Sequence, residues 1–173
     1  MNNEYLVKII RDIPDFPKKG IIFKDITTLL KDKKAFSQAI DIIYNQYKDK
    51  NIDVVVSVEA RGFIFGSALA YKLGAGFVPV RKKGKLPYKT ISENYELEYG
   101  IDELFMHEDA IEKWQNVLIV DDLLATAGTV KAVISMAEKL GGKIVGLAFL
   151  IELLFLNGKD KLKGYDIFSV IKY

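Results

Sequence analysis

Apolar runs of strand length that alternate with helical patterns are the feature that most limits the folds open to this chain. Four such runs fall at residues 52–58, 77–80, 117–120 and 144–151. Residues 35–47 and 63–73 carry apolar side chains at the i, i+3, i+4 spacing of helices, and Gly74 follows the second segment. Continuous apolar runs are typical of strands covered on both faces. The sequence therefore predicts an α/β fold with a central, mostly parallel twisted sheet flanked by helices, in one domain over residues 1–173.

One strand end in this pattern has the composition of an anion site. The run 117–120 stops at Asp121 and Asp122, a loop of small and hydroxyl-bearing residues follows at 125–129, and a helical pattern begins at Val130. Backbone N–H groups at a helix start lack intrahelical partners, and the helix dipole adds partial positive charge. Small residues let the backbone approach a ligand closely, and the two threonines of the loop can donate hydrogen bonds. The loop therefore predicts a phosphate site.

The paired carboxylates call for a different partner. Side by side at a strand end, Asp121 and Asp122 repel each other unless another group donates to them. A ribose diol or a bound cation would do so, and with the loop the pair suits a ribose 5-phosphate. For two aspartates alone, a helix N-cap or a solvated turn is the alternative interpretation.

A second strand end repeats the arrangement. The run 52–58 stops at Glu59, Ala60, Arg61 and Gly62, and the helical pattern begins at the next residue. A guanidinium at a helix start can pair bidentately with a phosphate, and a glycine lets main-chain N–H groups approach the same anion. A structural salt bridge is the alternative role of the arginine.

These residues carry a family resemblance. The stretch from Asp121 to Thr129 resembles the ribose-phosphate motif of type I phosphoribosyltransferases, which use phosphoribosyl pyrophosphate (PRPP). Its residue sequence is most similar to that of the adenine-specific members. The resemblance implies that Asp121 and Asp122 hold the ribose hydroxyls, that Leu123 faces the purine, and that the loop cradles the 5-phosphate. The loop residues in question are Ala125, Thr126, Ala127, Gly128 and Thr129. The family usually has a second glycine where this chain has Ala127, a residue that disfavours a positive φ but leaves room for phosphate.

The same resemblance implies a pyrophosphate site and a loop over the reaction centre. Glu59, Ala60 and Arg61 match the pyrophosphate loop, in which we expect an unusual peptide bond between Glu59 and Ala60. Arg81 and Lys85 match further pyrophosphate contacts, whereas the lysines between them suit a solvated face. Residues 82–107 correspond to the family's flexible loop and ribbon.

The purine end of the site is also implied by the resemblance. Glu98 matches the family's catalytic acid, which exchanges a proton with the purine. Tyr99, the next residue, would act as a gate of the active site. Residues 1–34 resemble an N-terminal hood that reads adenine through the Ile22 carbonyl and the Lys24 N–H. Phe23 would stack on the base, although an ordinary core role is its alternative.

The activity implied is transfer of phosphoribosyl from PRPP to adenine N9, which gives AMP and pyrophosphate, with Mg²⁺ bound mainly through PRPP and pyrophosphate. Family members are typically homodimers, so we expect one here. A phosphoribosyltransferase for another base and a non-catalytic PRPP-sensing regulator remain open alternatives.

Composition excludes several other classes of site. The chain has no cysteine and one histidine, so disulfides, thiol chemistry and a multi-histidine metal centre are excluded. A net charge of +2 gives no indication of nucleic-acid binding. Because no signal peptide or apolar run of membrane-spanning length is visible, we expect a cytoplasmic enzyme without membrane or nucleic-acid partners.

Overall fold

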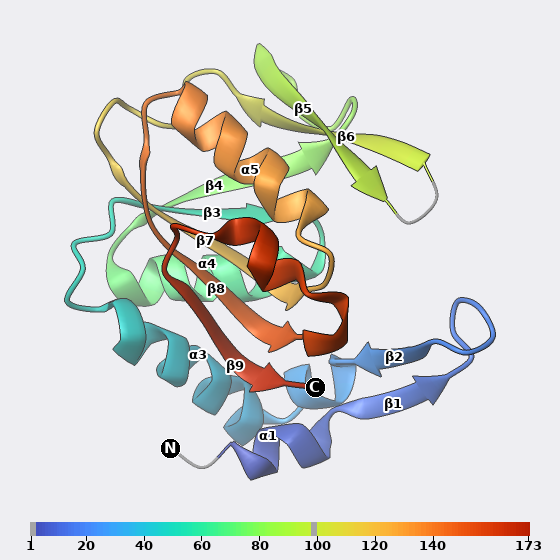
Figure 1. The fold of residues 1–173 in the computed structure, drawn as a ribbon. Helices are drawn as coiled ribbons and strands as arrows, with labels where there is room; N and C mark the ends of the chain where they lie inside the picture. Colours follow the sequence, from blue (N-terminus) through green and yellow to red (C-terminus); the bar gives the residue numbers. More distant parts are fainter. Residues whose placement is uncertain (1–2, 98–99) are drawn as a thin grey trace. The chain divides into compact units, whose positions relative to one another are not determined.

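The computed structural model describes residues 3–97 and 100–173 (Figure 1). The chain divides into two compact units, Met1–Ile42 and Ile43–Tyr173, and the predicted hood segment lies in the first. No helix in the described part of the chain is both long enough and apolar enough to cross a membrane.

The first unit is a small antiparallel hairpin with short helices. Strands β1 (Arg11–Pro14) and β2 (Ile22–Asp25) pair with Arg11 opposite Asp25, and these two side chains also form an ion pair. Helix α1 (Glu4–Ile9) packs on α2 (Thr27–Leu30), and α3 (Lys33–Tyr47) begins in this unit. The hairpin places the predicted adenine-reading residues on β2.

The second unit is built on a seven-stranded mixed sheet in the order β5-β6-β4-β3-β7-β8-β9. The five strands β4, β3, β7, β8 and β9 pair in parallel, and at one edge β6 pairs antiparallel with both β4 and β5. This confirms the predicted mostly parallel α/β architecture. Its strands are β3 (Val54–Val58), β4 (Gly76–Lys82), β5 (Thr90–Leu97), β6 (Gly100–His107), β7 (Asn116–Leu124), β8 (Lys143–Glu152) and β9 (Ile167–Lys172). Its helices are α4 (Arg61–Leu73), α5 (Gly128–Lys139) and the short 3₁₀ helices η1 (Leu154–Leu156) and η2 (Gly158–Leu162).

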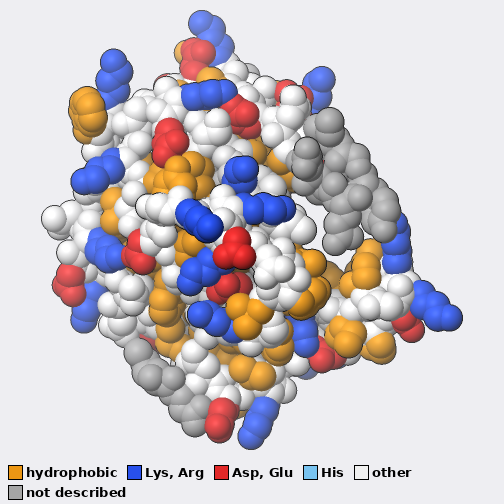
Figure 2. Space-filling model, viewed as in Figure 1, with side chains coloured by type: hydrophobic (Ala, Val, Ile, Leu, Met, Phe, Trp, Pro, Cys, Tyr) orange, Lys and Arg blue, Asp and Glu red, His pale blue; other side chains and the backbone are white. Residues whose placement is uncertain are grey.

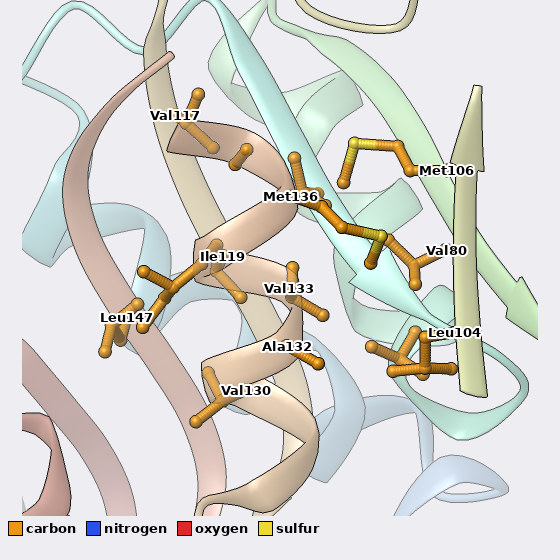
Figure 3. Packing of buried hydrophobic residues seen from close by; sticks show 14 of the residues in the cluster. Val80, Leu104, Met106, Val117, Ile119, Val130, Ala132, Val133, Met136 and Leu147 are labelled. Carbon is orange, nitrogen blue, oxygen red and sulfur yellow. The ribbon is translucent and has the colours of Figure 1, made fainter. Parts of the chain in front are cut away.

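The strands read as continuous apolar runs because each face of the sheet is covered by a helix. Alternate side chains of β3, β7 and β8 join the buried cluster beneath α5 (Figure 3). The intervening side chains of β3 and β7 face α4, and the close approach of Gly66 to Ser57 shows this for β3. Strand residues point alternately to opposite faces, so burial on both sides removes the polar–apolar alternation.

The order of connections places a topological switch point between β3 and β7. After β3 the chain crosses through α4 to β4 on one side, and after β7 it crosses through α5 to β8 on the other. The carboxyl ends of β3 and β7 therefore open into the crevice where ligands bind in sheets of this kind.

Two predicted strand and loop boundaries move in the structure. Strand β7 continues to Leu124 rather than stopping at residue 120, because its backbone remains paired with β8 through Asp121 and Leu123 whatever the side chains are. Most of the predicted 82–107 loop and ribbon is a β5–β6 hairpin that adds to the edge of the sheet beside β4.

Trp114 has a backbone conformation that suits glycine. Its φ is +74°, its N–H donates to the Gly141 carbonyl, and 84% of the residue is exposed. Left-handed backbone costs a non-glycine residue about 1–2 kcal/mol. A glycine variant avoids this cost but gains less than its full amount, because its unfolded chain has greater conformational entropy.

We therefore expect Trp114→Gly to raise the free energy of unfolding by about 0.5–1 kcal/mol in denaturant titrations. Trp114→Ala is the control, since it removes the exposed indole but keeps the Cβ atom that causes the strain. Equal stability of the two variants would show that the gain does not come from relief of backbone strain at residue 114.

Candidate functional site

The two carboxylates predicted to hold ribose lie at the end of β7 with an arginine from α4. Asp122 is buried, and its Oδ2 atom is 2.9 Å from Nε of Arg61. The Asp122 N–H donates to Oδ1 of Asp121 at 2.9 Å. The structure thus brings together Asp121, Asp122 and Arg61, which the sequence assigned to different strand ends. The structural salt bridge considered for Arg61 is also present, with Asp122 as its partner.

Burial governs the protonation of this carboxylate pair. Burial, and then repulsion from the Asp122 carboxylate, raises the pKa of Asp121 well above its ordinary value. Burial also raises the pKa of Asp122, while the Arg61 guanidinium acts to lower it. One guanidinium therefore balances two carboxyl groups only in part, so the pair favours a ligand that donates hydrogen bonds or carries positive charge.

A glycine at the start of α4 allows the helix to approach the pair. A Cβ atom on Gly62 would lie 2.6 Å from Oδ1 of Asp121 and 2.9 Å from Oγ of Ser57. The Ser57 side chain is fully buried, and its hydroxyl donates to the Val120 carbonyl at 2.5 Å. Sequence analysis did not single out Ser57, because a lone serine within an apolar strand carries no motif signal.

The predicted phosphate loop leads directly into α5. The helix begins at Gly128 after Ala127, and no side chain caps its N-terminus. Residues 121 and 123–130 line a pocket of about 60 Å³. Unpaired N–H groups at a helix start favour an anion, so the start of α5 beside this pocket is suited to bind one.

Ala127 keeps the positive φ that its side chain disfavours. Its φ is +69°, and the residue is almost completely buried. The loop thus has the left-handed geometry of a glycine-containing phosphate loop although an alanine occupies the position. Burial of the methyl group in the cluster beneath α5 offsets part of the backbone strain.

The predicted pyrophosphate residues gather around Glu59. The peptide bond between Glu59 and Ala60 is cis, which confirms the expected unusual bond. Oε2 of Glu59 accepts from Arg81 Nη2 at 3.0 Å, and Oε1 accepts from the Lys82 N–H at 2.7 Å. Burial acts to raise the pKa of Glu59, but these hydrogen bonds outweigh it and lower the pKa. The Lys85 carbonyl accepts from Arg81 Nη1 at 3.4 Å.

A second polar network joins this region to the β5–β6 hairpin. Lys82 Nζ lies 2.9 Å from Oδ2 of Asp102, which also accepts from the Tyr95 hydroxyl. Glu93 on the hairpin accepts from Ser135 and Lys139 of α5. Sequence analysis had assigned Lys82 to a solvated face, whereas the structure pairs it with Asp102. On the face seen in Figure 2, basic and acidic side chains are likewise intermingled.

The residues predicted to contact the purine are distributed over both units. Ile22, Phe23 and Lys24 lie on β2, where Phe23 makes an edge contact with Phe16 and Lys24 pairs with Asp12. Leu123 lies on β7 in the second unit. Glu98 and Tyr99 fall outside the described residues.

Comparison with known proteins identifies the family. The sequence model of the phosphoribosyl transferase domain family matches residues 25–171 of this chain. Adenine phosphoribosyltransferase of Thermotoga neapolitana is 61% identical over 168 residues, which cover 97% of this chain and 99% of that protein. The chain belongs to the adenine phosphoribosyltransferase family. Members of this family are transferases of purine salvage.

Two solved adenine phosphoribosyltransferases share the fold over nearly their full length. The crystal structure of the Thermoanaerobacter pseudethanolicus protein has a TM-score of 0.96 and 55% identity, and covers 99% of this chain and 100% of that one. The Saccharomyces cerevisiae protein, solved with adenine and an imino-altritol bisphosphate, has a TM-score of 0.91 and 37% identity. That match covers 96% of this chain and 97% of the yeast chain. The predicted family is therefore confirmed.

Proposed function

We propose that this chain transfers the 5-phosphoribosyl group from PRPP to N9 of adenine, giving AMP and pyrophosphate. The start of α5, which follows the carboxylate pair of Asp121 and buried Asp122 at the switch point of the sheet, is the observation that carries this proposal. It offers a phosphate site and a diol site a few residues apart, as a ribose 5-phosphate requires. The 61% identity to a named adenine phosphoribosyltransferase supports adenine as the base.

The ribose 5-phosphate binds between β7 and α5. Asp121 and Asp122 accept hydrogen bonds from the ribose 2- and 3-hydroxyls, and the backbone and hydroxyl groups of residues 125–129 donate to the 5-phosphate. Arg61, which is partly exposed beside Asp122, is available to the pyrophosphate. Arg81 and Lys85 contribute further positive charge, and Glu59 orients the Arg81 guanidinium.

Adenine is recognised by main-chain polar groups and by apolar side chains. The Ile22 carbonyl accepts from the exocyclic amine, the Lys24 N–H donates to a ring nitrogen, and Phe23 and Leu123 contact the ring faces. Because Lys24 acts here through its main chain, its side-chain pairing with Asp12 is compatible with the role. Tyr99 closes the site beside Glu98.

The reaction exchanges one bond at the anomeric carbon. N9 of adenine forms a bond to C1 of the ribose while the C1–O bond to pyrophosphate breaks, and pyrophosphate leaves with the electron pair. Glu98, the proposed catalytic residue near N7, accepts as a base the proton that adenine loses, and would donate it as an acid in the reverse reaction. Positive charge that develops on the ribose lies near the Asp121 and Asp122 carboxylates, which stabilise it.

Magnesium fits the donors of this site. The adjacent carboxylates Asp121 and Asp122 supply hard oxygen ligands of the kind that Mg²⁺ prefers. In the described part of the chain, no three His, Asp or Glu side chains gather as a metal site. A Mg²⁺ ion would be held mainly by oxygens of PRPP and pyrophosphate, with water completing its ligands. When bound, the ion neutralises charge on the leaving pyrophosphate.

The enzyme acts as a homodimer. Ile64 and Tyr71 lie seven residues apart on α4, and therefore on one face, with 38% and 91% of their surfaces exposed. A second copy would bury this pair from both sides of a two-fold axis. Sedimentation should give a dimer for the native chain and a smaller species for Tyr71→Asp.

Incubation with PRPP, Mg²⁺ and a panel of bases tests the activity. AMP formation with adenine, without nucleotide formation from hypoxanthine, guanine or orotate, supports the proposal. Nucleotide from another base in preference to adenine would assign a different phosphoribosyltransferase activity. Binding of PRPP without turnover of any base would identify a regulator instead. Chelation of Mg²⁺ should abolish the turnover.

A further inference from the structure

The 3₁₀ helix η2 packs its first residue against the backbone of the phosphate loop. Gly158 is buried, and a Cβ atom placed on it would lie 2.1 Å from the Ala125 carbonyl oxygen and 3.2 Å from the Ala127 nitrogen. Both contacts are to main-chain atoms, so a flexible side chain cannot move aside to make room. A residue larger than glycine therefore requires the loop itself to move.

This contact determines the direction of a loop N–H group. The Ala125 carbonyl points toward Gly158, and the peptide bond between residues 125 and 126 is not among the cis bonds of the chain. In a trans peptide the C=O and N–H bonds point in opposite directions. The Thr126 N–H is therefore directed away from Gly158, toward the opposite side of the loop.

η2 is itself fixed in place by its other end. Leu162 is fully buried and belongs to the same apolar cluster as Leu124, Ala127 and Val130. The chain entering η1 is also tied to β7, since the Leu153 N–H donates to the Leu124 carbonyl at 3.0 Å. The helix thus forms a rigid support behind the loop, although about thirty residues separate them in the sequence.

We infer that Gly158 is a positioning residue for the 5-phosphate site, and that η2 supports the loop so that its amides face the phosphate. The inference rests on the proposed function for the identity of the ligand. It assigns a role to the segment Gly158–Leu162, for which the proposed function names no contact with substrate. Its effect is on the ribose 5-phosphate end of PRPP and not on the pyrophosphate end, which is held by Arg61 and Arg81.

Gly158→Ala tests this assignment through calorimetric binding of two separate probes. Ribose 5-phosphate should bind about 10- to 100-fold more weakly, the loss expected for one or two charge-assisted hydrogen bonds. Pyrophosphate affinity should remain unchanged. In turnover assays KM for PRPP should rise by a similar factor, with a smaller change in kcat.

Gly146→Ala provides a matched control within the same unit. Its Cβ atom would lie 2.3 Å from the ring of Tyr47, a buried side chain remote from the loop. We expect loss of thermal stability but unchanged ribose 5-phosphate affinity. If Gly158→Ala does not fold, Leu162→Ala replaces it, because that variant loosens η2 without adding atoms beside the loop and should also weaken ribose 5-phosphate selectively.

The outcomes separate this inference from the proposed activity. The role of Gly158 would be overturned if Gly158→Ala and Leu162→Ala bind ribose 5-phosphate as the native protein does. It would also be overturned if their affinity for pyrophosphate falls equally. If the native protein makes no AMP but binds ribose 5-phosphate, and Gly158→Ala loses that binding, the activity is refuted and the positioning role stands.

Discussion

Glu98→Gln is expected to lower kcat for AMP formation by about 10²- to 10⁴-fold, the range for removing a general acid–base group. The amide keeps the size of the side chain but cannot exchange a proton with the purine. PRPP contacts lie elsewhere in the proposed site, so KM for PRPP should change only a few-fold. Steady-state kinetics with PRPP and adenine each varied would separate the two effects.

Glu96→Gln is the matched control for that experiment. Glu96 lies two residues earlier in the sequence and has no counterpart in the family's catalytic motif. It should retain native turnover. If both variants keep native kcat, the acid must be sought elsewhere. If both lose it equally, a general electrostatic effect of the hairpin is indicated.

Asp121→Asn is expected to change activity and stability in opposite directions. Without this carboxylate, the developing positive charge on the ribose loses a partner, and kcat/KM should fall by about 10²- to 10³-fold. The same substitution removes a buried charge that is repelled by Asp122, so the free energy of unfolding at pH 7 should rise by about 1 kcal/mol. Kinetics and denaturant titration on one preparation would measure both.

The stability gain should depend on pH in a defined sense. The pKa of Asp121 is raised in the fold above its ordinary 3.8, so the folded protein binds this proton more tightly than the unfolded chain. The free energy of unfolding of the native protein then falls as pH rises from 3.8 to the raised pKa of Asp121. The difference from Asp121→Asn should be small near pH 4 and reach its maximum above the raised pKa. Asp109→Asn, at an exposed carboxylate, is the control for the loss of one negative charge.

The fold was largely predictable because the strands are buried on both faces. Val54, Val55 and Val56 on β3 form a continuous apolar run, which is typical of a strand covered on both faces. Strand ends were less predictable. Asp121 interrupts the apolar pattern of β7, yet its backbone still pairs with Phe149, because strand pairing depends on N–H and C=O groups that every such residue has.

The site divides into local and non-local parts. The motif from Asp121 to Thr129 and the loop at Glu59 are local, and each could be interpreted from its own residue types. The support from Gly158 is non-local, because it depends on the path of the chain after β8, and no spacing rule relates it to Ala125. Ala127 shows the opposite difficulty, since residue type alone argues against the positive φ that surrounding packing maintains.

The ion pairs of the pyrophosphate region have a consequence for how ionic strength should act on PRPP binding. Arg61 and Arg81 each have a carboxylate within hydrogen-bonding distance, so a phosphate that binds them exchanges one anionic partner for another. Such exchange contributes little to long-range attraction, because each pair is neutral from a distance. Added salt should therefore slow PRPP association mainly through Lys83 and Lys85, while its effect on dissociation should reflect the two arginines.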